Sequence, residues 1–134
     1  LQAQNPNQVG CSQDLTGKAP PSAPEYSGNV RFGYEVPIGE ALKFTADGAV
    51  NFSGGYHVIA DRDPNTYQSA WEKFDLRVGF GDIDDKWNLA VVGRNLTNEV
   101  VIGSANDVVA SAGSYSVQVQ RGRTIALQAR FRFN

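Results

Sequence analysis

The sequence has a single cysteine, no methionine and little charge, and each shortage narrows what the chain can be. Charged residues make up 19% of the 134 positions and the formal net charge is -2. The scattered basic residues create no positive field that would attract nucleic acid. No apolar run approaches the roughly 18 residues of a membrane-spanning helix, yet Val, Ile, Phe and Tyr are too frequent for a wholly disordered chain. Nucleic-acid binding and a helical membrane protein are therefore excluded.

The first residues lack the features of a natural N-terminus. The sequence opens at Leu1 without an initiator Met and without the basic and apolar segments of a signal peptide, so we expect the chain to continue upstream. Cys11 is an odd cysteine in a polar segment, which is either an inert free thiol or one half of a disulfide. We expect a disulfide to a partner outside this chain.

Alternation of apolar and polar residues predicts five β-strands. In residues 26–36 the even positions are apolar or Gly and most odd positions are polar, which is the period of two typical of a half-exposed strand. The same pattern recurs four more times along the chain. The predicted strands are 26–36, 41–56, 71–81, 87–97 and 123–133.

Polar segments between these strands predict loops. Residues 1–25, 57–70 and 98–122 show no sustained alternation, so we expect three long loops there. Within the last of them, Tyr115, Val117 and Val119 share the parity of the final strand. We expect them to extend that strand, with a separate sixth strand as the alternative.

The charges of the alternating segments fall on one face of the predicted sheet. Only Glu72 and Arg123, at strand ends, have the parity of the apolar face. This pattern alone equally suits a soluble sandwich whose apolar face forms the core. The ionisable residues with polar-face parity are Arg31, Glu35, Lys43, Asp47, Lys73, Asp75, Arg77, Arg94, Arg130 and Arg132.

Three further observations favour a membrane barrel over a sandwich. Short turns at 37–40 and 81–86 alternate with the long loops, as expected when one rim faces the periplasm and the other the outside. In lipid, a five-stranded sheet with two open edges leaves the backbone groups of those edges without hydrogen bonds. In water, it leaves its apolar face unburied. More strands must therefore pair with it. Aromatic residues gather at strand ends, as in the two girdles of a membrane barrel. The girdle candidates are Tyr26, Tyr34, Tyr56, Phe80, Trp87 and Phe133. The predicted fold class is all-β, an antiparallel transmembrane β-barrel segment.

Three segments carry a resemblance to a known family. Residues 17–24 form a Gly-to-Pro loop before the first strand, and residues 87–99 contain Trp-Asn-Leu followed by Asn-Leu-Thr-Asn-Glu. Gly-Arg-Thr at 122–124 opens an alternation that closes in Arg-Phe-Arg-Phe at 130–133. In their order and spacing these segments resemble the C-terminal part of a TonB-dependent outer-membrane receptor. Two positions depart from the family pattern, namely Asn98 in place of Asp and Asn134 after the closing aromatic.

The resemblance implies a fold, a location and partners. Such receptors are 22-stranded barrels with an N-terminal plug in the bacterial outer membrane, and this chain would supply the last five strands. They import a scarce or bulky ligand such as a siderophore, a cobalamin-like molecule or an oligosaccharide. The implied partners are the remainder of the barrel and the plug, outer-membrane lipid, and the energy-coupling TonB protein through the N-terminal part. The alternatives are a secreted or surface β-sandwich with a structural or adhesive role, and a small complete barrel of about eight strands.

No residue pattern in the sequence is typical of catalysis. His57 is the only histidine, it lies in a different loop from Cys11, and no Ser stands in a nucleophile-elbow context, so we do not expect an enzyme. The segment 61–72 has oxygen ligands at the spacing of a calcium loop. Its sixth position is Thr66 where Gly is required, and Pro64 stiffens it. We therefore expect no metal or cofactor, with calcium at 61–72 as the alternative.

Candidate binding residues lie in the loops and on the polar face. Arg121 and Arg123 share the parity of Ile125 and come before the roughly 9 to 11 residues that cross the hydrocarbon. We expect both to point outward, where guanidinium groups pair with lipid phosphates; simple solvation is the alternative. The candidate ligand contacts are Asp61, Arg62, Asp63 and Tyr67 in the loop 57–70, and Arg77 and Arg94 on the polar face.

Overall fold

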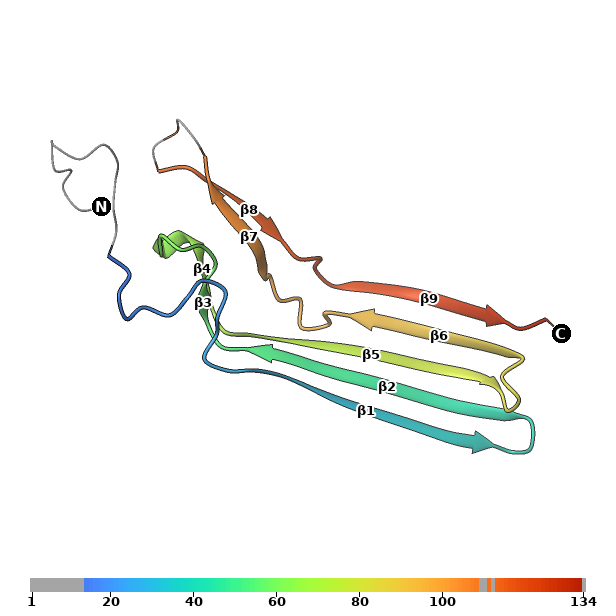
Figure 1. The fold of residues 1–134 in the computed structure, drawn as a ribbon. Coiled ribbons are helices and arrows are strands. Elements are labelled where there is room, and N and C mark those ends of the chain that lie inside the picture. Colours follow the sequence, from blue (N-terminus) through green and yellow to red (C-terminus); the bar gives the residue numbers. More distant parts are fainter. Residues whose placement is uncertain (1–13, 109–110, 112, 134) are drawn as a thin grey trace, which may run out of the picture.

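The computed structural model describes residues 14–108, 111 and 113–133, and this part of the chain is all-β apart from one short 3₁₀ turn. Its main feature is a five-stranded antiparallel sheet in the order β1-β2-β5-β6-β9 (Figure 1). The predicted all-β, antiparallel class is therefore confirmed. Within the described ranges, no helix is both long and apolar enough to cross a membrane. The sheet strands are β1 Ser27–Ile38, β2 Leu42–Ser53, β5 Trp71–Asp82, β6 Trp87–Arg94 and β9 Thr124–Phe131.

The register of the sheet aligns residues of like polarity across the strands. One row crosses all five strands as Tyr34, Ala46, Val78, Val91 and Leu127, and the rows on either side of it on this face are also apolar. We call this side of the sheet the apolar face and the opposite side the polar face. Figure 1 shows the sheet as a single layer, and no other described strand forms a second layer over either face. Large apolar side chains are consequently exposed, Tyr34 to 60% and Leu127 to 79%.

The two ends of the sheet differ. At one end, short turns join β1 to β2 and β5 to β6, and the chain also finishes there after β9 (Figure 1). We call this the short-turn end and the opposite one the loop end. Gly39 provides the positive φ of the first turn, 66°, which a residue with a side chain rarely adopts. The Ile83 N–H donates to the Ala41 carbonyl at 2.9 Å, and the Arg132 N–H donates to the Lys86 carbonyl at 2.8 Å. These bonds tie the neighbouring turns and the end of β9 together.

The long loops contain two further antiparallel sheets. β3 Tyr56–His57 pairs with β4 Tyr67–Gln68, and the 3₁₀ turn η1 Pro64–Thr66 lies between them. β7 Ile102–Asp107 pairs with β8 Tyr115–Val119. The segment predicted to extend the last strand is therefore a strand of its own, and that expectation was wrong. The partner of β8 comes from the same loop, and the chain bends away after it because the Gln120 N–H donates to the Val101 carbonyl at 2.8 Å.

Three predicted strands end early, and the predicted strand 123–133 is one of them because β9 ends at Phe131. The other two end early for identifiable reasons. The predicted strand 41–56 ends at Ser53, where the Gly54 N–H turns to the Tyr26 carbonyl at 2.8 Å. Gly55 next to it leaves no room for a side chain, because the Tyr67 ring lies against it. The predicted strand 87–97 ends at Arg94, the last residue of β6, because Asn95 takes a left-handed φ of 49°.

A small buried cluster lies at the loop end of the sheet. Val101 and Thr66 are fully buried, Ala105 is 3% exposed and Val58 is 8% exposed. These four residues come from both long loops, and the Ile102 N–H donates to the Gln68 side-chain oxygen at 2.7 Å between them. We call the four residues the loop core. The hydrogen bond from Ile102 to Gln68 connects β7 with β4.

Candidate functional site

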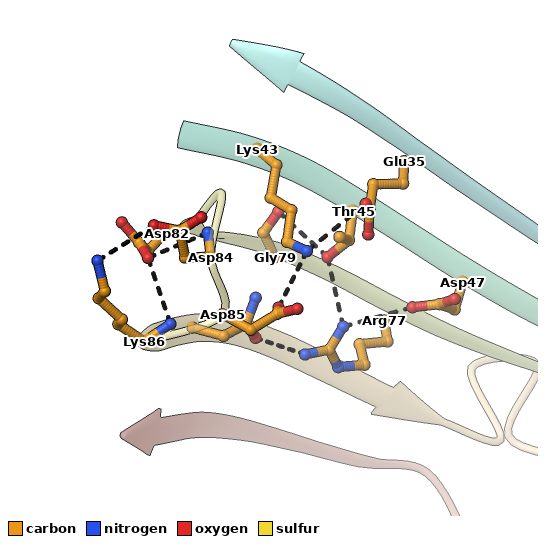
Figure 2. A network of polar contacts seen from close by, with 11 residues as sticks. Glu35, Lys43, Thr45, Asp47, Arg77, Gly79, Asp82, Asp84, Asp85 and Lys86 are labelled. Carbon is orange, nitrogen blue, oxygen red and sulfur yellow. Dashed lines mark hydrogen bonds and ion pairs between the residues drawn. The ribbon is translucent and has the colours of Figure 1, made fainter. Parts of the chain in front are cut away.

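The candidate site is the polar face of the sheet, where charged side chains from several strands meet. Lys43 on β2 is 8% exposed, and its Nζ lies 3.5 Å from Oε1 of Glu35 on β1 and 3.0 Å from Oδ1 of Asp85 in the turn after β5. Figure 2 shows this ammonium between the two carboxylates. One buried cation therefore links β1, β2 and the β5–β6 turn.

Arg77 on β5 is the second centre of this network. Its Nη1 lies 3.3 Å from Oδ2 of Asp47 and donates to the Thr45 hydroxyl at 3.4 Å (Figure 2). Its Nη2 donates to Asn88 on β6, and its Nε donates to Gln128 on β9 at 3.4 Å. Such half-exposed ion pairs contribute at most about 1 kcal/mol each. The network therefore matters mainly because it fixes the guanidinium above four adjacent strands.

The turn between β5 and β6 is held by its own carboxylates. Asp82 Oδ2 accepts the backbone N–H groups of Asp84 and Lys86 at 3.1 and 3.3 Å. The hydrogen bond from Lys43 lowers the pKa of Asp85, and Lys43's charge lowers it further. The hydrogen bond to Asp84 raises the pKa of Lys86. Both shifts favour the charged forms, so the turn keeps its ion pairs at neutral pH.

Two hollows lie side by side on the polar face. The first, of about 570 Å³, lies over the network around Lys43 and Arg77 and extends to Arg130. The second, of about 500 Å³, includes Arg94 and the small residue Ala126. Arg77 lines both hollows, as does Gln128. This arrangement holds polar groups that are suited to noncovalent binding.

The loop residues predicted to contact a ligand are largely engaged in holding the loop. Asp63 caps η1 by accepting the Asn65 N–H at 2.8 Å, and Asp61 Oδ1 accepts the Asp63 N–H at 3.1 Å. Arg62 donates to the Ala19 carbonyl at 3.0 Å, which joins two loops. Tyr67 remains 46% exposed and packs edge-on against His57, with 5.0 Å between the ring centroids. Of the loop candidates, Tyr67 presents the largest free surface.

The remaining candidates divide between the polar face and the rims. Arg77 and Arg94 line the same hollow, so the structure brings these two together. The backbones of Arg121 and Arg123 are anchored by Asn95 and Asn98, while both side chains are exposed. Cys11 lies outside the described residues. Over those residues, no group of three or more His, Cys, Asp and Glu is placed to hold a metal ion, including the segment 61–72.

The aromatic candidates are found at both ends of the sheet. Three of them lie at the short-turn end: Phe80, Trp87 and Phe133, of which Phe133 is 91% exposed. Tyr34 lies farther from this end, in the row of Ala46 and Val78. Phe80 packs edge-on against Phe44 across β2 and β5, at 5.1 Å between centroids. At the loop end, Tyr26 is 58% exposed just before β1, whereas Tyr56 belongs to β3 and not to the main sheet.

Asn95 has a structural role that residue patterns did not reveal. It is 4% exposed, its N–H donates to Asp75 Oδ1 at 2.7 Å, and its amide donates to the carbonyls of Glu99 and Arg121 at 2.9 and 3.3 Å. Its side-chain oxygen accepts the Glu99 N–H at 3.0 Å. Asn95 therefore ties the end of β6 to β5 and to the start of β9. The signal available in the sequence was an Asn directly after an alternating run, because Asn adopts the left-handed region more readily than most residues.

Comparison of the chain with protein-family models, with curated proteins and with solved structures finds no match in any of the three.

Proposed function

We propose that this chain forms the last five strands of a TonB-dependent receptor barrel in the bacterial outer membrane. The uncovered apolar face of the sheet carries the proposal. Its central row includes Val78, Val91 and Leu127, and the side chains of Val91 and Leu127 are 51% and 79% exposed. A sheet in water buries such a face against another layer, whereas acyl chains cover it in a membrane barrel.

The edges of the sheet support the same proposal. β1 and β9 each pair with one neighbour only, so each has a row of backbone groups without a partner strand in the described part of the chain. In hydrocarbon these groups must be hydrogen-bonded, and closing the sheet into a barrel with additional strands satisfies them. The resemblance to the receptor family sets the total at 22 strands and assigns a plug and TonB as further partners.

The proposed orientation follows from the two ends of the sheet. The short turns face the periplasm and the loop end faces outward, as in other outer-membrane barrels. Arg121 and Arg123 then lie at the outer headgroup layer, and the polar face lines the lumen. Ligand enters from the loop end, where Tyr67 is exposed. The ligand class in this proposal is a siderophore, a cobalamin-like molecule or an oligosaccharide.

Two tryptophans on opposite faces provide a matched test. Trp87 lies on the apolar face opposite Phe131, whereas Trp71 lies opposite Ser53 on the polar face. Variants Trp71→Phe and Trp87→Phe each leave one tryptophan in the described strands. In vesicles of lipid brominated near the headgroup, we expect strong quenching of Trp87 fluorescence and little quenching of Trp71.

The same purified material separates the proposal from a β-sandwich. A membrane barrel needs detergent for extraction, while a sandwich dissolves in buffer. A monodisperse monomer in buffer without detergent, or equal quenching of the two tryptophans, would overturn the proposal.

A further inference from the structure

The polar face carries more positive charge than the chain as a whole. The chain has 12 basic and 14 acidic residues. Within the five strands, the polar face holds half of the basic residues and less than a quarter of the acidic ones. The remaining acidic residues lie outside this face. The basic residues of this face are Arg31, Lys43, Lys73, Arg77, Arg94 and Arg130, and the acidic ones are Glu35, Asp47 and Asp75.

The three carboxylates of the polar face are already committed. Glu35 is paired with Lys43 and Asp47 with Arg77. Asp75, on the strand beside β6, accepts the backbone N–H of Asn95. None of the three forms an ion pair with a residue of β6 or β9 within the described ranges.

This pairing leaves four basic residues of the polar face without an ion pair in the described chain. Arg31 donates to Asn29 and Lys73 donates to Gln120, which sets them apart from Arg94 and Arg130. Arg94 is on β6 and Arg130 on β9, both are exposed, and neither side chain has a hydrogen bond or ion pair in the part of the chain that the structure describes. Arg77 lies between them and is held in place by its four partners. Two guanidinium groups without a hydrogen bond or ion pair therefore flank a fixed one. The charge of Arg130 also acts on Asp85, which lines the same hollow and is paired with Lys43.

The two hollows connect these three arginines. Arg94 and Arg77 line one hollow, Arg77 and Arg130 line the other, and Gln128 lines both. In the register, Arg94 lies opposite Thr124 on β9, six residues before Arg130, so the line extends for about 20 Å along the strand. The small side chains of Ala90 and Ala126 lie on this face between its ends.

We propose that this line of arginines binds a small soluble oxyanion with more than one acidic group. A guanidinium fork matches the geometry of carboxylate and phosphate, and two hollows of about 500 Å³ each are the size of ordinary small-molecule sites. The inference rests on the proposed function, because it assigns the ligand of the proposed importer to the anionic class. Arg94 meets the ligand from the loop end, and Arg130 binds its far end.

The test is a calorimetric titration of the purified full-length protein in detergent at low salt. Citrate is the polyanionic probe, inorganic phosphate carries a single acidic centre, and glucose is the neutral control. We expect binding in the order citrate, phosphate, glucose. Arg94→Gln and Arg130→Gln should each weaken citrate binding about tenfold, because each removes a charge-assisted contact.

Arg31→Gln is the matched control. It removes the same charge from the same face, but Arg31 lies on β1 and is already bonded to Asn29 at 3.0 Å. Citrate affinity should change less than twofold in this variant. Arg94→Lys and Arg130→Lys retain the charge and should stay within about threefold of the parent, which guards against a loss caused by misfolding.

Three results would overturn the inference. These are citrate binding no tighter than glucose binding, equal citrate and phosphate affinities, or a loss in Arg31→Gln as large as that in Arg94→Gln. The tryptophan quenching experiment reports membrane insertion independently, so a barrel that inserts but does not bind citrate contradicts this inference alone.

Discussion

The sheet and the loop core differ in what covers their apolar side chains. The residues of the loop core are covered within the described chain, with Val101 fully buried and Ala105 3% exposed. The sheet leaves larger residues uncovered, such as Phe131 at 61% and Ile125 at 70%. Both regions contain apolar residues suited to burial. Only those of the loop core are buried by other described residues. From this difference we infer that whatever covers the apolar face of the sheet lies outside the described residues.

The largest expected effect tests the apolar face directly. Val78 lies in the middle of β5 on this face. In the proposed barrel this position is near the membrane midplane, where an arginine costs roughly 2 to 4 kcal/mol. We expect Val78→Arg to lower the free energy of unfolding by that amount in urea titrations in lipid vesicles. Ala49→Arg is the control, because Ala49 lies on the polar face between Arg31 and Asp75. Equal losses in the two variants would mean that the assigned faces are wrong. Gly79 is unsuitable as a control, since a side chain there would press on Ala90 at 3.0 Å.

The junction between the two regions is tested at Asn95. Asn95→Ala removes the side-chain bonds to Glu99 and Arg121 and leaves buried backbone groups unsatisfied, so we expect a loss of about 2 kcal/mol in the same titration. Asn106→Ala, at an exposed position of β7, should change the free energy of unfolding by less than about 0.5 kcal/mol. A tolerated Asn95→Ala would show that the loop end and the sheet are held together by other contacts.

Two adjacent valines test the loop core. Val101 is fully buried and Val100 is 64% exposed, so the same change to Ala separates burial from composition. Val101→Ala should destabilise β7–β8 by roughly 1 to 2 kcal/mol, through lost transfer energy and a residual cavity. Hydrogen exchange of the β7 and β8 amides measures this. Faster exchange in Val100→Ala than in Val101→Ala would contradict the assignment of the core.

The smallest expected effect concerns pH at the short-turn end. Because Lys43 lowers the pKa of Asp85 in the folded protein, the pair stabilises the fold above the unfolded pKa of about 3.9. This contribution is lost as the pH falls through the lowered pKa of the folded state. The parent should therefore be more stable than Asp85→Asn at pH 6, and the difference should vanish towards pH 2. Urea titrations at the two pH values check this, and a difference that grows in acid would reverse the assigned role.

The sheet was predictable from sequence because its pattern is local. Alternation around Val30, Val50, Val78, Val91 and Leu127 assigns both strand and face, and the structure aligns these residues on one side of the sheet. Since the side-chain period is two, the parity of a strand also specifies which charges share the polar face.

The rest depends on contacts between residues far apart in the sequence. The partner of β8 is β7, Ile102–Asp107, which is rich in small and polar residues and has a shift in register after Ile102. The sequence of this segment therefore lacks the alternation that would predict a strand. The role of Asn95 arises from bonds to Asp75 and Arg121, which lie on other strands. The pairing that leaves Arg94 free likewise depends on which carboxylates are already occupied. These contacts depend on the three-dimensional arrangement of the strands, so they cannot be predicted from the order of the residues alone.

The β7–β8 hairpin also has a consequence for the rate at which β9 pairs with β6 during folding. β6 and β9 pair from Arg94 and Thr124 onward, so residues 95–123 form a long loop that must close. Once the hairpin has formed, Ile102 and Val119 are already neighbours, and only the short segments on either side of it remain to be ordered. Shortening the flexible loop in this way lowers the entropic free-energy cost of closing it by about 1 kcal/mol. A hairpin that forms before β9 pairs with β6 therefore acts as a spacer that speeds this pairing.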